Sequence, residues 1–182
     1  MVYNIQMKLS LSFAASLNGK ITKGLDKDVE KWTSSEDQEH LENIRRDVDV
    51  LIRSGVTYEI AKDKIEQAKD RLHIIITRDS EKFENEQKDG FLEFVTGDLK
   101  EIKENLANRG YKNALLSAGS GLAAAFMKER LIDELIITYE PKVFGQGKPM
   151  FNDFEGNLDL KLAKLKQAND RGTIIAFYEV LK

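Results

Sequence analysis

Three apolar segments of this chain end in glycines, hydroxyl side chains or an arginine, the groups that bind phosphorylated nucleotides. These ends are the stretches Ser54-Gly55-Val56-Thr57, Thr77-Arg78-Asp79-Ser80 and Gly119-Ser120-Gly121. A glycine turn at a helix start exposes backbone N–H groups at the positive helix pole, where an anion is stabilised. A guanidinium pairs with phosphate oxygens. Each stretch also has an ordinary explanation, as a close backbone approach or a polar loop, but their agreement favours a nucleotide site.

A second candidate region is SLNGKI, residues 16–21, which follows the first apolar segment. Asn18-Gly19 is first of all a turn signal. A turn at a strand end can also present Ser16, Asn18 and Lys20 to a polar ring or a phosphate. Both explanations remain open at this level.

Trp32 and Asp37 flank a predicted helix start. A carboxylate in a first turn is favourable with the helix dipole, whether or not it binds anything. Asp37 could also hold the amidine-like edge of a heterocycle. The two histidines, His40 and His73, are interpreted as a helix-face residue and a structural residue in an apolar strand.

Strands and helices must alternate to position these groups. Apolar runs predict strands at 7–13, 48–52, 72–76, 91–95, near Leu115, near Leu135, at 158–165 and at 173–180. Helices are expected after Ser34-Ser35, after an N-cap at Thr57, after Gly97-Asp98, and from Leu122 to about Arg130. The pattern predicts an α/β fold with a mostly parallel central sheet, flanking helices and an antiparallel C-terminal edge. Ligands of such sheets bind at the carboxyl ends of the strands.

Composition narrows the class of protein. The 182 residues fit one domain, 1–182, with 41% hydrophobic and 32% charged residues and a net charge of −3. The scattered charges lack the basic stripe of a nucleic-acid binder. There are no cysteines and two distant histidines, which offer no metal-ligand spacing. The sequence contains no signal peptide and no apolar run long enough to span a membrane, so we expect a cytoplasmic location.

Several segments resemble a known family. They are SLNGKI (16–21), WTSSED (32–37), the run from Ile44-Arg45 to Asp49-Val50-Leu51-Ile52, and LIDELIITYEPKVFGQGKPMF (131–151). Together they resemble the reductase domain of bacterial riboflavin biosynthesis, the RibD C-terminal domain, which belongs to the dihydrofolate-reductase-like superfamily. The resemblance runs from about residue 7 to the last strand, and 131–151 is its most specific part.

The resemblance implies an NADPH-dependent oxidoreductase that transfers a hydride to a pyrimidine- or pteridine-linked substrate. It implies that Thr77 and Arg78 hold the adenosine 2′-phosphate. It also implies that Ser54, Gly55, Thr57 and the turn Gly119-Ser120-Gly121 hold the pyrophosphate region. Ser16, Asn18 and Lys20 would line the substrate pocket, where Asn18, Lys20 and Asp37 are the candidate catalytic residues. A small-molecule substrate and a homodimer are the partners that it implies.

Two positions depart from the family pattern. Asn18 stands where the family usually has aspartate, and Ala118-Gly119-Ser120 stands for Glu-Gly-Gly. The missing carboxylates are groups that would bind a pyrimidine edge or assist proton transfer, so the substrate stays unassigned. The spacing from Trp32 to Asp37 also resembles dihydrofolate reductase, which is the first alternative. A nucleotide-binding protein without catalysis is the second.

Overall fold

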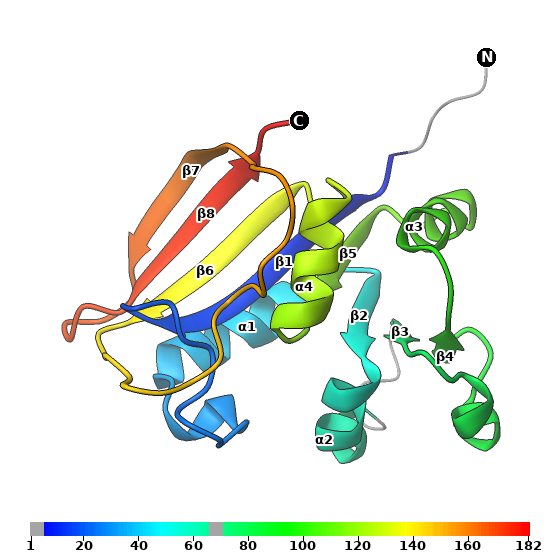
Figure 1. Cartoon of the computed structure of the whole chain (residues 1–182), viewed down its shortest axis with the longest axis horizontal. Coiled ribbons are helices and arrows are strands. Elements are labelled where there is room, and N and C mark those ends of the chain that lie inside the picture. Colours follow the sequence, from blue (N-terminus) through cyan, green and yellow to red (C-terminus); the bar gives the residue numbers. More distant parts are fainter. Residues whose placement is uncertain (1–5, 66–70) are drawn as a thin grey trace.

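The computed structural model of the chain describes residues 6–65 and 71–182. Its described strands form one eight-stranded sheet in the order β4-β3-β2-β5-β1-β6-β8-β7 (Figure 1). The strands are β1 (Lys8–Ser16), β2 (Val50–Ser54), β3 (Leu72–Ile76), β4 (Leu92–Val95), β5 (Asn113–Leu116), β6 (Glu134–Glu140), β7 (Leu160–Gln167) and β8 (Ile174–Val180). The helices are α1 (Ser35–Arg46), α2 (Gly55–Ile65), α3 (Leu99–Asn108) and α4 (Ser120–Lys128), with short 3₁₀ turns at Val29–Lys31 and Glu81–Glu86.

The sheet has the predicted architecture. Strands β1 to β6 pair in parallel, whereas β8 pairs antiparallel with β6 and β7 pairs antiparallel with β8. The expectation of a mostly parallel sheet with an antiparallel C-terminal edge is therefore confirmed. The β7–β8 turn closes through Gly172, whose N–H donates to the Asn169 carbonyl at 3.2 Å.

Helices cover both faces of the sheet (Figure 1). The face under α3 and α4 carries the larger core, in which Leu106 and Phe126 pack with Leu9 and Leu11 of β1. A smaller core joins Tyr58 of α2 to Phe94 of β4 and Phe83 on the opposite face. Helix α1 lies on that second face as well, and Asp37 is its one buried residue. This helix therefore covers the sheet loosely.

Two helices begin earlier than predicted. Helix α2 begins at Gly55 rather than after Thr57, because the Ser54 hydroxyl accepts the Thr57 N–H at 3.2 Å and acts as the cap. Helix α4 begins at Ser120 with Gly119 as its N-cap, so Ser120 and Gly121 lie in its first turn. The expected cap at Thr57 was wrong by three residues, and the expected helix start at Leu122 was wrong by two.

Among the described residues, no helix combines the length and the apolarity that crossing a membrane requires.

Candidate functional site

The three polar strand ends lie side by side. They follow β3, β2 and β5, which are neighbours in the sheet and run parallel. Their carboxyl ends therefore share one edge, and the sheet brings Ser54, Thr77 and Gly119 to that edge. The next strand along is β1, so Ser16 at its end continues the same edge.

The start of α4 leaves its first N–H groups accessible to an anion. Its N-cap, Gly119, supplies no side-chain hydrogen bond to the first turn. The φ of Gly119 is −77°, which any residue can adopt, and a Cβ built there would meet nothing within 4 Å. The fold itself thus does not demand glycine here. Open space above an uncapped helix N-terminus fits a phosphate group.

The loops after β2 and β3 contact each other. The Ser54 and Thr57 hydroxyls are 2.9 Å apart, and a Cβ at Gly55 would lie 3.6 Å from the Thr77 hydroxyl. Arg78 is exposed, and it makes no hydrogen bond or ion pair within the described part of the chain. A guanidinium without a protein partner at this edge is available to a ligand.

Two expected binding residues lie against the 149–152 segment of the protein. Ser120 is 4% exposed, and its hydroxyl donates to the Pro149 carbonyl. Gly121 faces the Asn152 amide, 3.5 Å from a built Cβ. No peptide bond in the described ranges is cis, so the bond between Gly119 and Ser120 is trans. At this helix start the backbone N–H groups, rather than the Ser120 hydroxyl, remain for a cofactor.

Asn18 joins two loops. Its amide oxygen accepts from the Ser16 hydroxyl at 2.8 Å and from the Phe144 N–H at 3.1 Å, and its amide nitrogen donates to the Phe144 carbonyl at 2.8 Å. An aspartate would lack that donor. The Asn18 amide is thus hydrogen-bonded within the protein on both its oxygen and its nitrogen, and its catalytic role stays a prediction. Ser16 is fully buried, so Lys20, which is half-buried, is the member of this segment with a side chain left for a ligand.

Asp37 lies in a buried polar group between α1 and β6. Its side chain is 5% exposed and hydrogen-bonds with Thr138 and Thr33. Burial raises the pKa of Asp37, and the negative charge of Glu140 acts in the same direction. Thr138 stands opposite Ala14 of β1, and Ala14 and Ser12 remain half-buried although β1 is a central strand. Solvent therefore reaches the sheet beside Asp37, where a heterocycle would bind.

Sequence reasoning missed Thr138 and Glu140 as members of this group. Their alternation with Ile136 puts all three on the face of β6 that α1 covers. That alternation was readable in the sequence. Which helix covers the face was not, because residues 34–37 and 138–140 meet only through the fold.

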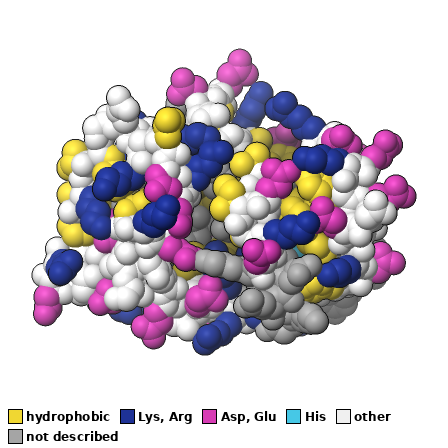
Figure 2. Space-filling model, turned by 90° about the horizontal axis from the view of Figure 1, so that it is seen from below, with side chains coloured by type: hydrophobic (Ala, Val, Ile, Leu, Met, Phe, Trp, Pro, Cys, Tyr) yellow, Lys and Arg dark blue, Asp and Glu magenta, His cyan; other side chains and the backbone are white. Residues whose placement is uncertain are grey.

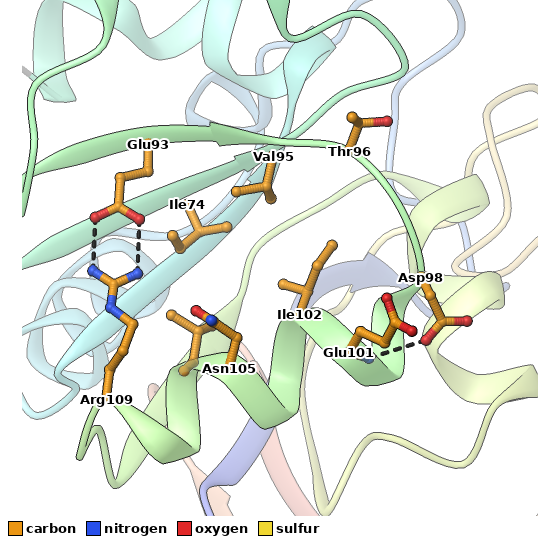
Figure 3. Close-up of a pocket in the computed structure, with 10 residues that line it drawn as sticks. Ile74, Glu93, Val95, Thr96, Asp98, Glu101, Ile102, Asn105 and Arg109 are labelled. Carbon is orange, nitrogen blue, oxygen red and sulfur yellow. Dashed lines mark hydrogen bonds and ion pairs between the residues drawn. The ribbon is translucent and has the colours of Figure 1, made fainter.

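A separate cavity lies between β3, β4 and α3. It has a volume of about 350 Å³, with Ile74 and Ile102 in its lining (Figure 3). Glu93 pairs there with Arg109 through two bonds of 2.7 Å, and Asp98 caps α3. These groups satisfy each other, and none of the predicted site residues lines the cavity.

The edge carries mixed charge. Figure 2 views the molecule from the side where the parallel strands end, and on its described part lysines and arginines alternate with acidic side chains. A local guanidinium such as Arg78, rather than a broad basic field, would therefore select a phosphate at this edge.

Comparisons with known proteins agree with this fold. The curated relative YwjB of Bacillus subtilis is 27% identical over 168 residues, which cover 90% of this chain and 93% of that protein. The structure of RibD from Acinetobacter baumannii aligns with a TM-score of 0.77 at 23% identity, over 98% of this chain and 59% of that one. Dihydrofolate reductase from Enterococcus faecalis, solved with NADP(H), aligns with a TM-score of 0.63 at 17% identity, over 98% and 99% of the two chains.

The fold is thus that of the dihydrofolate-reductase-like proteins. The family model of the RibD C-terminal domain matches residues 7–174. That range includes every residue of the candidate site. This chain therefore belongs to the RibD C-terminal domain family.

Proposed function

We propose that this protein is an NADPH-dependent reductase that transfers a hydride to a pyrimidine- or pteridine-linked heterocycle. The observation that carries the proposal is the shared edge of β3, β2 and β5. It combines an uncapped helix N-terminus, paired hydroxyls and an arginine without a protein partner. Family membership supports a reductase, and the dihydrofolate reductase with the same fold was solved with NADP(H).

The residues divide into two groups in this proposal. Arg78 and Thr77 hold the 2′-phosphate, and Ser54, Gly55, Thr57 and the start of α4 hold the pyrophosphate. NADPH supplies the hydride when it is bound. Asp37 holds the heterocycle and donates the proton that accompanies the hydride, which leaves a carboxylate that water reprotonates. Lys20 pairs with an anionic group of the substrate.

The test has two stages. The first stage titrates the protein with NADPH and NADH by fluorescence, and we expect one NADPH per chain and weaker NADH. The second stage measures NADPH oxidation with the ribosylamino-pyrimidine phosphate of riboflavin biosynthesis and with dihydrofolate. Because Asn18 is committed to Phe144 and Ala118 carries no carboxyl group, we expect little turnover of the riboflavin precursor. Turnover at roughly 1 per second or faster would make the riboflavin precursor the substrate.

Dihydrofolate reduction is the second candidate activity. Its specific support is the position of Asp37, which lies five residues after Trp32 in the chain and makes a buried hydrogen bond with Thr138. A carboxyl group in that setting suits a pteridine amidine edge. Turnover of dihydrofolate alone, removed in Asp37→Asn, would establish it. Cofactor binding without turnover of any acceptor would favour a nucleotide-binding protein without catalysis.

We also infer that the protein forms a homodimer. Leu160, Leu162 and Leu165 of the edge strand β7 are 40%, 49% and 59% exposed. A β-bulge after Leu162 keeps all three on one face, opposite Val180, Tyr178 and Ala176 of β8. An apolar stripe on a sheet face favours association with a second copy.

A further inference from the structure

Asp37 and Glu140 are two buried acidic residues that both form a hydrogen bond with Ser34, Asp37 through its backbone N–H and Glu140 through its carboxyl group. Asp37 is 5% exposed and Glu140 is 2% exposed. The Asp37 N–H donates to the Ser34 hydroxyl at 3.3 Å, and the Ser34 N–H donates to Glu140 Oε1 at 2.7 Å. Ser34 is the N-cap of α1. Glu140 therefore fixes the helix start that carries Asp37.

The hydrogen bonds to Glu140 have fixed directions. A backbone N–H can only donate, so Oε1 of Glu140 must accept the hydrogen bond from Ser34. The Thr173 hydroxyl lies 3.0 Å from Oε2, and it accepts from the Asn169 amide at 3.1 Å. Because that amide supplies one proton, the hydroxyl directs its own proton to Glu140. Both carboxyl oxygens of Glu140 thus accept hydrogen bonds from the protein.

The partners of Asp37 impose no such direction. Its side chain bonds with the hydroxyls of Thr138 and Thr33, each of which can donate or accept. The charged groups that act on it are Glu140 from β6 and Arg45 from α1. Burial is the largest cause of the raised pKa of Asp37, and Glu140 raises the pKa further, while Thr138, Thr33 and Arg45 lower it. Burial and the charge of Glu140 thus both favour the protonated form of Asp37.

We propose that Glu140 is a positioning residue that keeps the proton on Asp37. It anchors the first turn of α1 through Ser34, and its negative charge opposes ionisation of the neighbouring Asp37 carboxyl group. The catalytic consequence rests on the proposed function, because a protonated Asp37 is the form that donates to a substrate. The protonation itself does not depend on that function.

The primary test is a titration of the Asp37 carboxyl carbon by ¹³C NMR, with the signal assigned from Asp37→Asn. Glu140→Gln retains the shape and the acceptor for Ser34 but removes the charge. We expect the Asp37 midpoint to move to lower pH in this variant. A midpoint that is unchanged, or higher, would overturn the proposal. NADPH binding, which uses the other strand ends, should be unchanged.

Glu36→Gln is the matched control. Glu36 lies in the same first turn of α1, but it is half-buried and bonds to Asn169 rather than facing Asp37. Loss of its charge should leave the Asp37 midpoint in place, and an equal shift in both variants would show a general field effect and refute the specific role. If Glu140→Gln does not fold, Thr173→Val is judged by the same criterion. It removes the hydroxyl that donates to Glu140, so the Asp37 midpoint should again fall.

Kinetics provide the second readout. If the protein reduces a heterocycle, Glu140→Gln should move the pH at which kcat/KM falls to half its maximum to a lower value, as it does the NMR midpoint of Asp37. The KM for NADPH should be unaltered. Absence of turnover with every acceptor would count against the proposed function alone. An unshifted NMR midpoint would count against the role of Glu140 alone.

Discussion

Arg53 Nη1 on β2 donates a hydrogen bond of 2.8 Å to Nδ1 of His73 on β3. Arg53 is 5% exposed and His73 is fully buried. Since guanidinium can only donate, Nδ1 is the acceptor, and a cation is buried against a neutral ring rather than a carboxylate. Burial is the main cause that lowers the pKa of Arg53 to about 9. The charged side chain therefore costs the folded state free energy.

Replacing this arginine should stabilise the protein. We expect Arg53→Met to raise the free energy of unfolding in urea at pH 7 by about 1–4 kcal/mol, the range seen when apolar residues replace buried ions. The unfolded chain binds the proton more tightly than the folded one, so wild-type stability gains as pH rises through about 9. The difference between variant and wild type should narrow there. A lower urea midpoint for the variant at pH 7 would contradict this account.

Arg78 should discriminate between the two nicotinamide cofactors. Arg78→Ala is expected to weaken NADPH binding by roughly 1.5–3 kcal/mol, the scale of a hydrogen bond to a charged group, and to leave NADH nearly unchanged. Isothermal titration with both cofactors measures this. Arg171→Ala, an exposed arginine on the β7–β8 turn, is the control and should bind both normally. Equal losses for NADPH and NADH would remove Arg78 from the 2′-phosphate site.

Gly119 should matter for the cofactor and not for the fold. Gly119→Val places a side chain in open space at a permitted φ, so the thermal midpoint should stay close to wild type. NADPH titration should show no binding, because the side chain occupies the place of the phosphates. Gly147→Val is the contrasting variant. Its Cβ would lie 2.0 Å from the Thr22 carbonyl oxygen at a φ of +153°, so we expect it to destabilise the protein. Normal NADPH affinity in Gly119→Val would make that turn purely structural.

The leucine face of β7 should control association. Leu162→Glu is expected to weaken self-association at least about tenfold, about 1.4 kcal/mol, because a charge would be buried between copies. Sedimentation at several concentrations measures this. Leu25→Glu is the control, because it makes the same substitution at a leucine that lies outside β7 and is 98% exposed. It should leave association unaltered. A wild-type protein that sediments as a monomer at all concentrations would refute the homodimer.

The order of strands and helices could largely be predicted from local sequence patterns. Alternation in residues 7–13 and the apolar runs at 48–52 and 72–76 predicted β1, β2 and β3, because side-chain periodicity and burial are properties of short segments. Parallel pairing then required the polar ends Ser54, Thr77 and Gly119 to share an edge. Helix starts were less predictable, because the Ser54 hydroxyl, rather than Thr57, caps α2.

Tertiary structure alone decided which polar side chains remain available. Asn18 and Ser120 look like ligand-binding residues in the sequence, yet Phe144 and Pro149, more than 25 residues away, occupy their hydrogen-bonding groups. Asp37 shows the converse, since an ordinary helix-start carboxylate gains a raised pKa only in the folded protein, where burial is the largest cause and the charge of Glu140 adds to it. Local pattern specifies elements and the edge where they meet, whereas desolvation and charge depend on contacts between distant segments, which no local pattern contains.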